Sequence, residues 1–310
     1  MNGEGSIRQT PLHGEVFLDH VGWFVSDALQ GADAFERLGF VLTPLVLHRL
    51  DVPGVGLPQL AGTANRCAML PAGYLECISA VGGQDTVLSR AHRAATARYV
   101  GVHLVAFSVS DARATHERLS ASGFDPLDPA HLRRPLDPDG SEAEAAFTVI
   151  RVPPSLMPEG RIQFLVHETP ELTWGDRASS GSNRLFRLSS VLICTEDPEA
   201  AAIRFGRFLG REPAIRSHGA WVHLDRGAVG FGSRHRCRRL LPGAYIPPPP
   251  SIAAVGLESE DLPFSMRHFA DRGVRPTFAN DSRFHLGSEV AAGTALVVHL
   301  PSHYWLSERE

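Results

Sequence analysis

The chain has no long apolar run. A membrane-spanning helix needs about 20 consecutive, mostly apolar residues, and the 310-residue sequence contains no such stretch. Its first residues, MNGEGSIRQTPLHGE, lack the charged and apolar regions of a secretory signal. We therefore expect a soluble protein of the cytoplasm that does not associate with a membrane.

Cysteine is scarce, and several catalytic motifs are missing. The four cysteines, Cys67, Cys77, Cys194 and Cys237, form no CxxC pair, which favours reduced thiols over a disulfide framework or a zinc ribbon. The sequence has no GxSxG, HExxH or P-loop motif, and no GxGxxG between a strand and a helix. Serine hydrolases, zincins and nucleotide enzymes are therefore disfavoured.

Positive charge is not in excess either. Lys and Arg together number 30 against 34 Asp and Glu, for a net charge of −4. Nucleic-acid binding depends on clustered cations that neutralise phosphates, so we expect a small-molecule partner and no nucleic acid. The basic run RHRCRR at 234–239 is short and lacks interleaved aromatics, and we interpret it as a solvated loop.

What the sequence does contain is a fourfold repeat. Each copy has an apolar strand ending near Asp, a helical stretch with apolar residues three and four apart, and then shorter strands. The strand and helix pairs are 17–27 with 28–40, 101–111 with 112–124, 187–197 with 198–210, and 251–261 with 262–274. This pattern predicts an α+β fold of four βαβββ units.

The small, polar segment 177–184 predicts a linker between two halves. We expect an N-terminal module at 1–176 that carries the functional site and a C-terminal module at 185–310. The proline-rich run at 243–251 indicates a rigid connection inside the second module. Because the two modules can pair within one chain, a monomer and a homodimer both remain open.

The stretch LDHVGWFVSD followed by ALQGADAFERLGF, with AGYLECIS at 72–79 and IQFLVHETPELTW at 162–174, resembles glyoxalase-like members of the vicinal oxygen chelate superfamily. The resemblance covers most of 17–175 and, as a repeat pattern, 187–302. It implies paired βαβββ units that form a half-barrel. It also implies one divalent metal ion, Fe, Mn, Zn, Ni or Co, on the concave face.

The same resemblance implies His20 on the first strand and Glu76 on the fourth as metal ligands. Strand alternation places Leu18, His20 and Gly22 on one face of their strand and Glu76 among apolar neighbours on its own. An unpaired carboxylate buried there would be costly. A core histidine and a surface carboxylate are the alternatives.

His103 and Gln163 are the remaining candidate ligands. His20 precedes Asp27 by seven residues but His103 precedes Asp111 by eight, so alignment puts Leu104 at the ligand position. Only a β-bulge between His103 and Asp111 would turn His103 to that face. Gln163 aligns with Glu76 on the last strand and is a weaker donor.

Substrate contacts are expected from His167, His48, Arg151 and Arg161. The arginines could hold a carboxylate or phosphate by paired hydrogen bonds, or could be solvated surface charges. In the second module the alignment gives Ser190, Gly230 and Ala254 at the ligand positions. None of these is a good ligand, so that module is expected to be structural or to shape the pocket.

Three functions fit these features. The first is a metal-dependent isomerase or lyase that stabilises an enediolate-like anion on vicinal substrate oxygens. The second is a non-haem iron dioxygenase of the extradiol type. The third is a metal-free protein that binds a small molecule and confers resistance. The sequence identifies no catalytic base.

Overall fold

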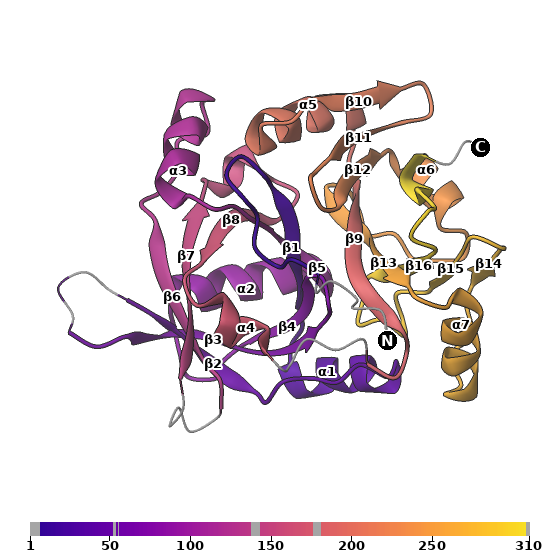
Figure 1. Ribbon diagram of the computed structural model, residues 1–310, viewed down its shortest axis with the longest axis horizontal. Coiled ribbons are helices and arrows are strands. Elements are labelled where there is room, and N and C mark those ends of the chain that lie inside the picture. The colour runs from indigo at the N-terminus through magenta and orange to yellow at the C-terminus, as the bar shows by residue number, and fades with distance from the viewer. Residues whose placement is uncertain (1–6, 52–53, 55, 138–142, 176–180, 308–310) are drawn as a thin grey trace, which may run out of the picture.

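The computed structural model describes residues 7–51, 54, 56–137, 143–175 and 181–307. Two β-sheets lie side by side, one coloured indigo to magenta and the other orange to yellow (Figure 1). None of the helices in these residues is long and apolar enough to cross a membrane. The expected α+β class is confirmed.

The first sheet closes into a barrel. Its strands are β1 (Phe17–Phe24), β2 (Val46–Leu50), β3 (Gln59–Met69), β4 (Tyr74–Ala80), β5 (Gly101–Ser108), β6 (Ala130–Pro135), β7 (Glu144–Arg151) and β8 (Arg161–His167). They follow the order β1-β4-β3-β2-β6-β7-β8-β5 around the barrel. Helices α1 (Ala28–Arg37), α2 (Val87–Arg98), α3 (Ala112–Ala121) and α4 (Pro170–Thr173) and the 3₁₀ turn η1 (Pro154–Leu156) connect them.

The second sheet stays open. Its strands are β9 (Leu185–Cys194), β10 (Pro213–Arg216), β11 (Gly219–His223), β12 (Ala228–Gly232), β13 (Ser251–Ser259), β14 (Phe278–Ala279), β15 (Arg283–Leu286) and β16 (Ala295–His299). Their order is β10-β11-β12-β9-β13-β16-β15-β14. Helices α5 (Pro198–Leu209), α6 (Arg234–Leu240) and α7 (Leu262–Asp271) and the turn η3 (Trp305–Ser307) complete this half.

The repeated aspartates explain where the helices begin. Asp27, Asp111, Asp197 and Asp261 are the N-caps of α1, α3, α5 and α7, and each accepts hydrogen bonds from backbone N–H groups of the first turn. The cap comes shortly after the first strand of each unit. The order of one strand, one helix and three strands occurs four times in the chain.

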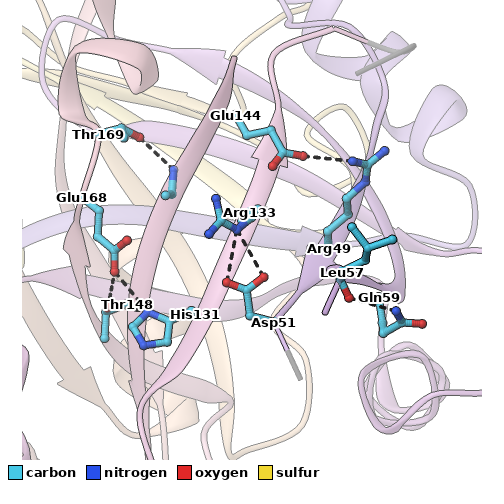
Figure 2. Close-up of polar contacts among 11 residues, drawn as sticks. Arg49, Asp51, Leu57, Gln59, His131, Arg133, Glu144, Thr148, Glu168 and Thr169 are labelled. Atoms are coloured by element: carbon cyan, nitrogen blue, oxygen red, sulfur yellow. Dashed lines mark hydrogen bonds and ion pairs between the residues drawn. The ribbon is translucent and has the colours of Figure 1, made fainter. Parts of the chain in front are cut away.

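The closed barrel differs from the half-barrel that the resemblance implies. Strand β2 pairs with β6 through Arg49 with Arg133 and Leu50 with Leu132. Figure 2 shows the polar contacts along this seam, where Arg133 lies 3.2 Å from both carboxylate oxygens of Asp51. Arg49 also lies 3.1 Å from Glu144. Because these ion pairs are partly exposed, each contributes little to the free energy of folding.

The second sheet packs against β1 and β5 of the barrel. The Trp23 indole is fully buried there and donates a 3.0 Å hydrogen bond to the carbonyl of Ala291. Of the predicted linker, only 181–184 lies within the described residues. In that part Asn183 is buried and donates to the carbonyl of Leu38 at 3.0 Å, so it connects the end of α1 to β9.

The concave face of the second sheet is filled by the chain itself. Trp305 and Leu306 are buried against it, and the Trp305 indole donates to Ser190 Oγ at 2.9 Å. A Cβ at Gly230 would lie 2.7 Å from Leu306, and one at Gly256 would lie 2.7 Å from the Trp305 nitrogen. Side chains from α6 pack in the same cluster. The solvated loop expected at 234–239 is therefore wrong, because this run forms α6 and buries Arg236 and Cys237.

Candidate functional site

The barrel contains a cavity of about 80 Å³. Its wall combines polar side chains with aliphatic and aromatic ones. The polar lining includes His20, His48, Thr63, Asn65, Glu76, Arg134, Arg151, Arg161 and Gln163, and the apolar lining includes Ile78, Leu88, Leu104, Leu132, Phe147, Val149 and Leu165.

His20 enters this cavity beside a β-bulge. Leu18 pairs with Phe107 on β5 and His20 pairs with the next residue, Ala106, so Asp19 is an extra residue in β1. The bulge lets neighbouring side chains meet: His20 Nδ1 donates to Asp19 Oδ1 at 2.8 Å. The Nε2 atom of His20 is consequently left to face the carboxylate of Glu76, 3.7 Å away.

Asp19 is a site residue that sequence reasoning missed. It is fully buried and its second oxygen accepts a 2.9 Å hydrogen bond from His167 Nε2. Burial by itself raises the pKa of Asp19, but the charges and hydrogen bonds of His167 and His20 hold this pKa well below its usual range. The available signal was an acidic residue inside an otherwise apolar strand, next to the candidate ligand.

Glu76 is the centre of the polar wall. It lies on β4 opposite Gly22 of β1, and its Oε1 accepts from the amide of Asn65 and lies 3.3 Å from His48 Nε2. Burial raises the pKa of Glu76, but the hydrogen bond and charge of His48, the charge of His20 and the Asn65 bond lower it to about 2. Glu76 is thus held ionised inside the barrel.

Two imidazoles therefore face one carboxylate. The Nδ1 atom of His48 lies 2.8 Å from Thr63 Oγ1, as that of His20 does from Asp19, so each ring is oriented through one nitrogen and presents the other to Glu76. Within the described part of the chain, no three His, Cys, Asp or Glu side chains lie close enough together to hold a metal ion. The contacts are pairwise and share Glu76.

His103 lies apart from these groups. A bulge does occur on β5, but at His103 itself: Gly22 pairs with Leu104 and Trp23 with Val102. Every β5 residue from Leu104 to Ser108 pairs with a residue of β1. The bulge that would turn His103 to the ligand face, between His103 and Asp111, is therefore absent from this stretch. His103 instead donates from Nε2 to the Tyr99 carbonyl at 2.8 Å and stacks on the Tyr99 ring.

Of the other residues predicted to bind metal or substrate, some line the cavity and one does not. Gln163 and Leu104 line it, as the alignment of the repeats predicted for the two remaining ligand positions. His48 lines it too, but as a partner of Glu76. His167 is buried and does not line the cavity; it binds Asp19, and its ring packs edge-on against Phe147, which does line it.

Arg151 and Arg161 supply positive charge without a protein counterion. Both line the cavity and are partly buried, and no described residue forms an ion pair or a side-chain hydrogen bond with either guanidinium. Burial lowers the pKa of Arg151. Burial and the nearby Arg151 charge lower the pKa of Arg161 to about 10. Guanidinium groups of this kind can pair with a carboxylate or phosphate through two parallel hydrogen bonds.

Solved structures share this fold at low sequence identity. A hypothetical protein from Staphylococcus aureus gives a TM-score of 0.64 at 9% identity, covering 92% of this chain and 99% of its own. A variant of 4-hydroxymandelate synthase from Streptomyces coelicolor gives 0.54 at 13%, covering 94% and 95%. A fusion of a xylose isomerase-like TIM barrel with 4-hydroxyphenylpyruvate dioxygenase gives 0.57 at 12%, covering 96% and 51%. These likenesses show the fold alone.

The sequence itself gives a more specific match. No curated protein matches the chain, but the profile of a family described as a glyoxalase-like domain matches residues 18–209. The match includes the whole barrel and continues through β9 and α5 of the second sheet. It confirms the resemblance to the vicinal oxygen chelate superfamily. The chain belongs to the glyoxalase-like domain family.

Proposed function

We propose that the protein is a metal-dependent enzyme of the isomerase or lyase type that acts on a small organic acid with adjacent oxygens. In this proposal each half of the chain is one vicinal oxygen chelate module, and only the barrel half is active. The observation that carries the proposal is the shared orientation of His20 and His48 toward the ionised Glu76, in a cavity that also holds two unpaired arginines.

The donor chemistry fits a divalent ion. Two histidines and one carboxylate form a common set for such metals, and ligand imidazoles usually have their other nitrogen held by a carboxylate or another polar group. Asp19 and Thr63 hold the rings of His20 and His48 in that manner. Bonds near 2.1 Å imply ligand spacings of about 3.0–3.4 Å; the 3.3 Å from His48 Nε2 to Glu76 Oε1 lies in this range, and the 3.7 Å from His20 Nε2 to Glu76 Oε2 exceeds it.

A bound ion would polarise the substrate oxygens and stabilise a developing anion. The chain's own residues do the rest. Arg151 and Arg161 bind the carboxylate and so orient the substrate. Asp19 fixes the ring of His20, and the apolar wall formed by Leu104, Phe147 and its neighbours excludes water. Gln163 is placed to donate a hydrogen bond to a substrate oxygen.

Metal analysis tests the proposal directly. Protein purified without chelators, or reconstituted with Mn²⁺, Co²⁺, Ni²⁺, Zn²⁺ or anaerobic Fe²⁺, should bind one equivalent of ion. His20→Ala and Glu76→Gln should lose it. His235→Ala, which removes an exposed histidine from α6, is the matched control and should keep it. Circular dichroism checks that each variant is folded.

One observation favours a second candidate, the metal-free binding protein. Leu104 occupies a ligand position with an apolar side chain, so only two of the four expected positions carry strong donors. Absence of stoichiometric metal in the wild type under every condition would reject the metal-dependent proposal and favour simple binding. Oxygen uptake by the iron-loaded form would favour the dioxygenase instead.

A further inference from the structure

A second cavity lies against the outside of the barrel, between α2 and the start of β8. Its volume is about 460 Å³. Its wall is mostly apolar, with side chains such as Val87, Leu88, Ala91, Ala94, Leu127 and Met157, and it also includes Arg98, His103, Arg151 and Arg161. Val87 is 74% exposed and Leu127 is 52% exposed, so apolar surface remains uncovered at this groove. We call this cavity the α2 groove.

Helix α2 leaves the groove open because its residues there are small. It buries only Ser89 and His92 of its own sequence, and His92 ties it to the barrel by a 2.9 Å hydrogen bond with the carbonyl of Ile78. Ala91 and Ala94 extend no further than Cβ toward β8. The helix is not part of any βαβββ unit, so packing of the repeat does not account for this surface.

The α2 groove and the barrel cavity share part of their walls. Leu88, Arg151 and Arg161 line both. The two guanidiniums therefore stand where the apolar groove meets the polar interior, and Arg161 lies over the ring of Phe24, 5.2 Å from its centroid. A molecule held at this junction would have its charged group near the arginines and could extend in both directions.

We propose that the substrate is an amphipathic carboxylic acid whose carboxylate binds between Arg151 and Arg161 and whose apolar chain lies in the α2 groove. This inference rests on the proposed function, because the oxygen-bearing end of the same molecule reaches the His20–Glu76 end of the cavity. Charge complementarity at the inner end and an apolar outer wall favour one ligand with a single anionic head. A ligand without an anionic group would leave both arginines unpaired.

The nearest charges support the same occupant. The carboxylate of Glu76 interacts electrostatically with Arg161, but its oxygens already contact His48 and Asn65. A carboxylate between the two guanidiniums would accept hydrogen bonds from both.

Binding of straight-chain carboxylates from butanoate to dodecanoate, measured by calorimetry, tests the inference. Each methylene buried in the groove should tighten binding by about fourfold, corresponding to about 0.8 kcal/mol, until the groove is full. Ala94→Trp should abolish the dependence on chain length and leave butanoate binding unchanged. Ala97→Trp, on the same helix but outside the groove, should behave as the wild type.

Arg161→Gln should weaken binding of every chain length by a similar factor, because it removes a contact to the head. Affinity that does not rise with chain length in the wild type, or equal behaviour of the two tryptophan variants, would overturn the proposal. Metal content should be the same in wild type and Ala94→Trp. A protein that binds metal through His20 but shows no length dependence therefore refutes only the substrate class, and the reverse result refutes only the metal.

Discussion

Removal of the Trp305 side chain should destabilise the protein strongly. Trp305 is 1% exposed, fills the concave face of the second sheet, and donates a 2.9 Å hydrogen bond to Ser190 Oγ. Truncation of a buried aromatic costs about 3–5 kcal/mol. Ser190 would keep only the 3.4 Å contact with Ser189, so we expect Trp305→Ala to lose about 4 kcal/mol out of a typical total of about 5–15.

Urea unfolding followed by far-ultraviolet circular dichroism measures this loss without relying on tryptophan fluorescence. The control is Tyr245→Ala, because Tyr245 is 58% exposed and its removal should change stability by no more than about 0.5 kcal/mol. Indole should bind the cavity left by Trp305→Ala. At about five times its dissociation constant it would restore about 1 kcal/mol. A loss below about 1 kcal/mol, or no effect of indole, would refute the view that Trp305 occupies a ligand-sized space.

Three further results are expected. Burial, with the nearby Arg283, lowers the pKa of His285 to about 4. As the pH falls, the unfolded chain protonates this histidine near pH 6.5 and the folded protein only near pH 4, so His285 alone should contribute a loss of about 1.4 kcal/mol of stability per pH unit across this window. His285→Gln should remove that much of the slope in denaturation at several pH values. Leu104→His, which places an imidazole at the vacant ligand position, should tighten Co²⁺ binding in a spectroscopic titration, and unchanged affinity would count against the position. Asp51→Asn should cost less than about 1 kcal/mol, because its partner Arg133 is 42% exposed on its side chain, and a larger loss in thermal unfolding would mean that the β2–β6 seam depends on this pair.

Local signals in the sequence predict the repeat because they act within a few residues. Each unit places an Asp at the end of its first strand, and the structure uses all four as helix caps, so the starts of α1, α3, α5 and α7 follow from the sequence. Closure of the barrel does not follow. Strand β2 meets β6, about 80 residues later, through the pairing of Arg49 with Arg133, and nothing in either segment specifies the other.

The site shows the same division between local and non-local information. The family resemblance and strand alternation single out His20 and Glu76, and in the structure β1 and β4 are neighbours, with Gly22 opposite Glu76. Alternation fails at the bulges, which break the period of two on which the argument depends. One bulge brings Asp19 to His20, and the other turns His103 toward Tyr99. Both depend on how β5 pairs with β1.

The two sheets have the same order of elements but fill their concave faces differently, and this difference limits how the second could ever acquire a site. Gly230 aligns with Glu76, and a Cβ there would already lie 2.7 Å from Leu306. A carboxylate at this position would both collide with the tail and be buried among apolar side chains without a partner. The lack of ligands and the occupation by residues 305–306 are therefore coupled, because a carboxylate at position 230 would require Leu306 to move. The barrel keeps its polar interior for the complementary reason. Its wall already contains Asp19, Asn65 and Thr63 as partners for the charged groups, so the interior can remain unfilled by protein and open to a ligand.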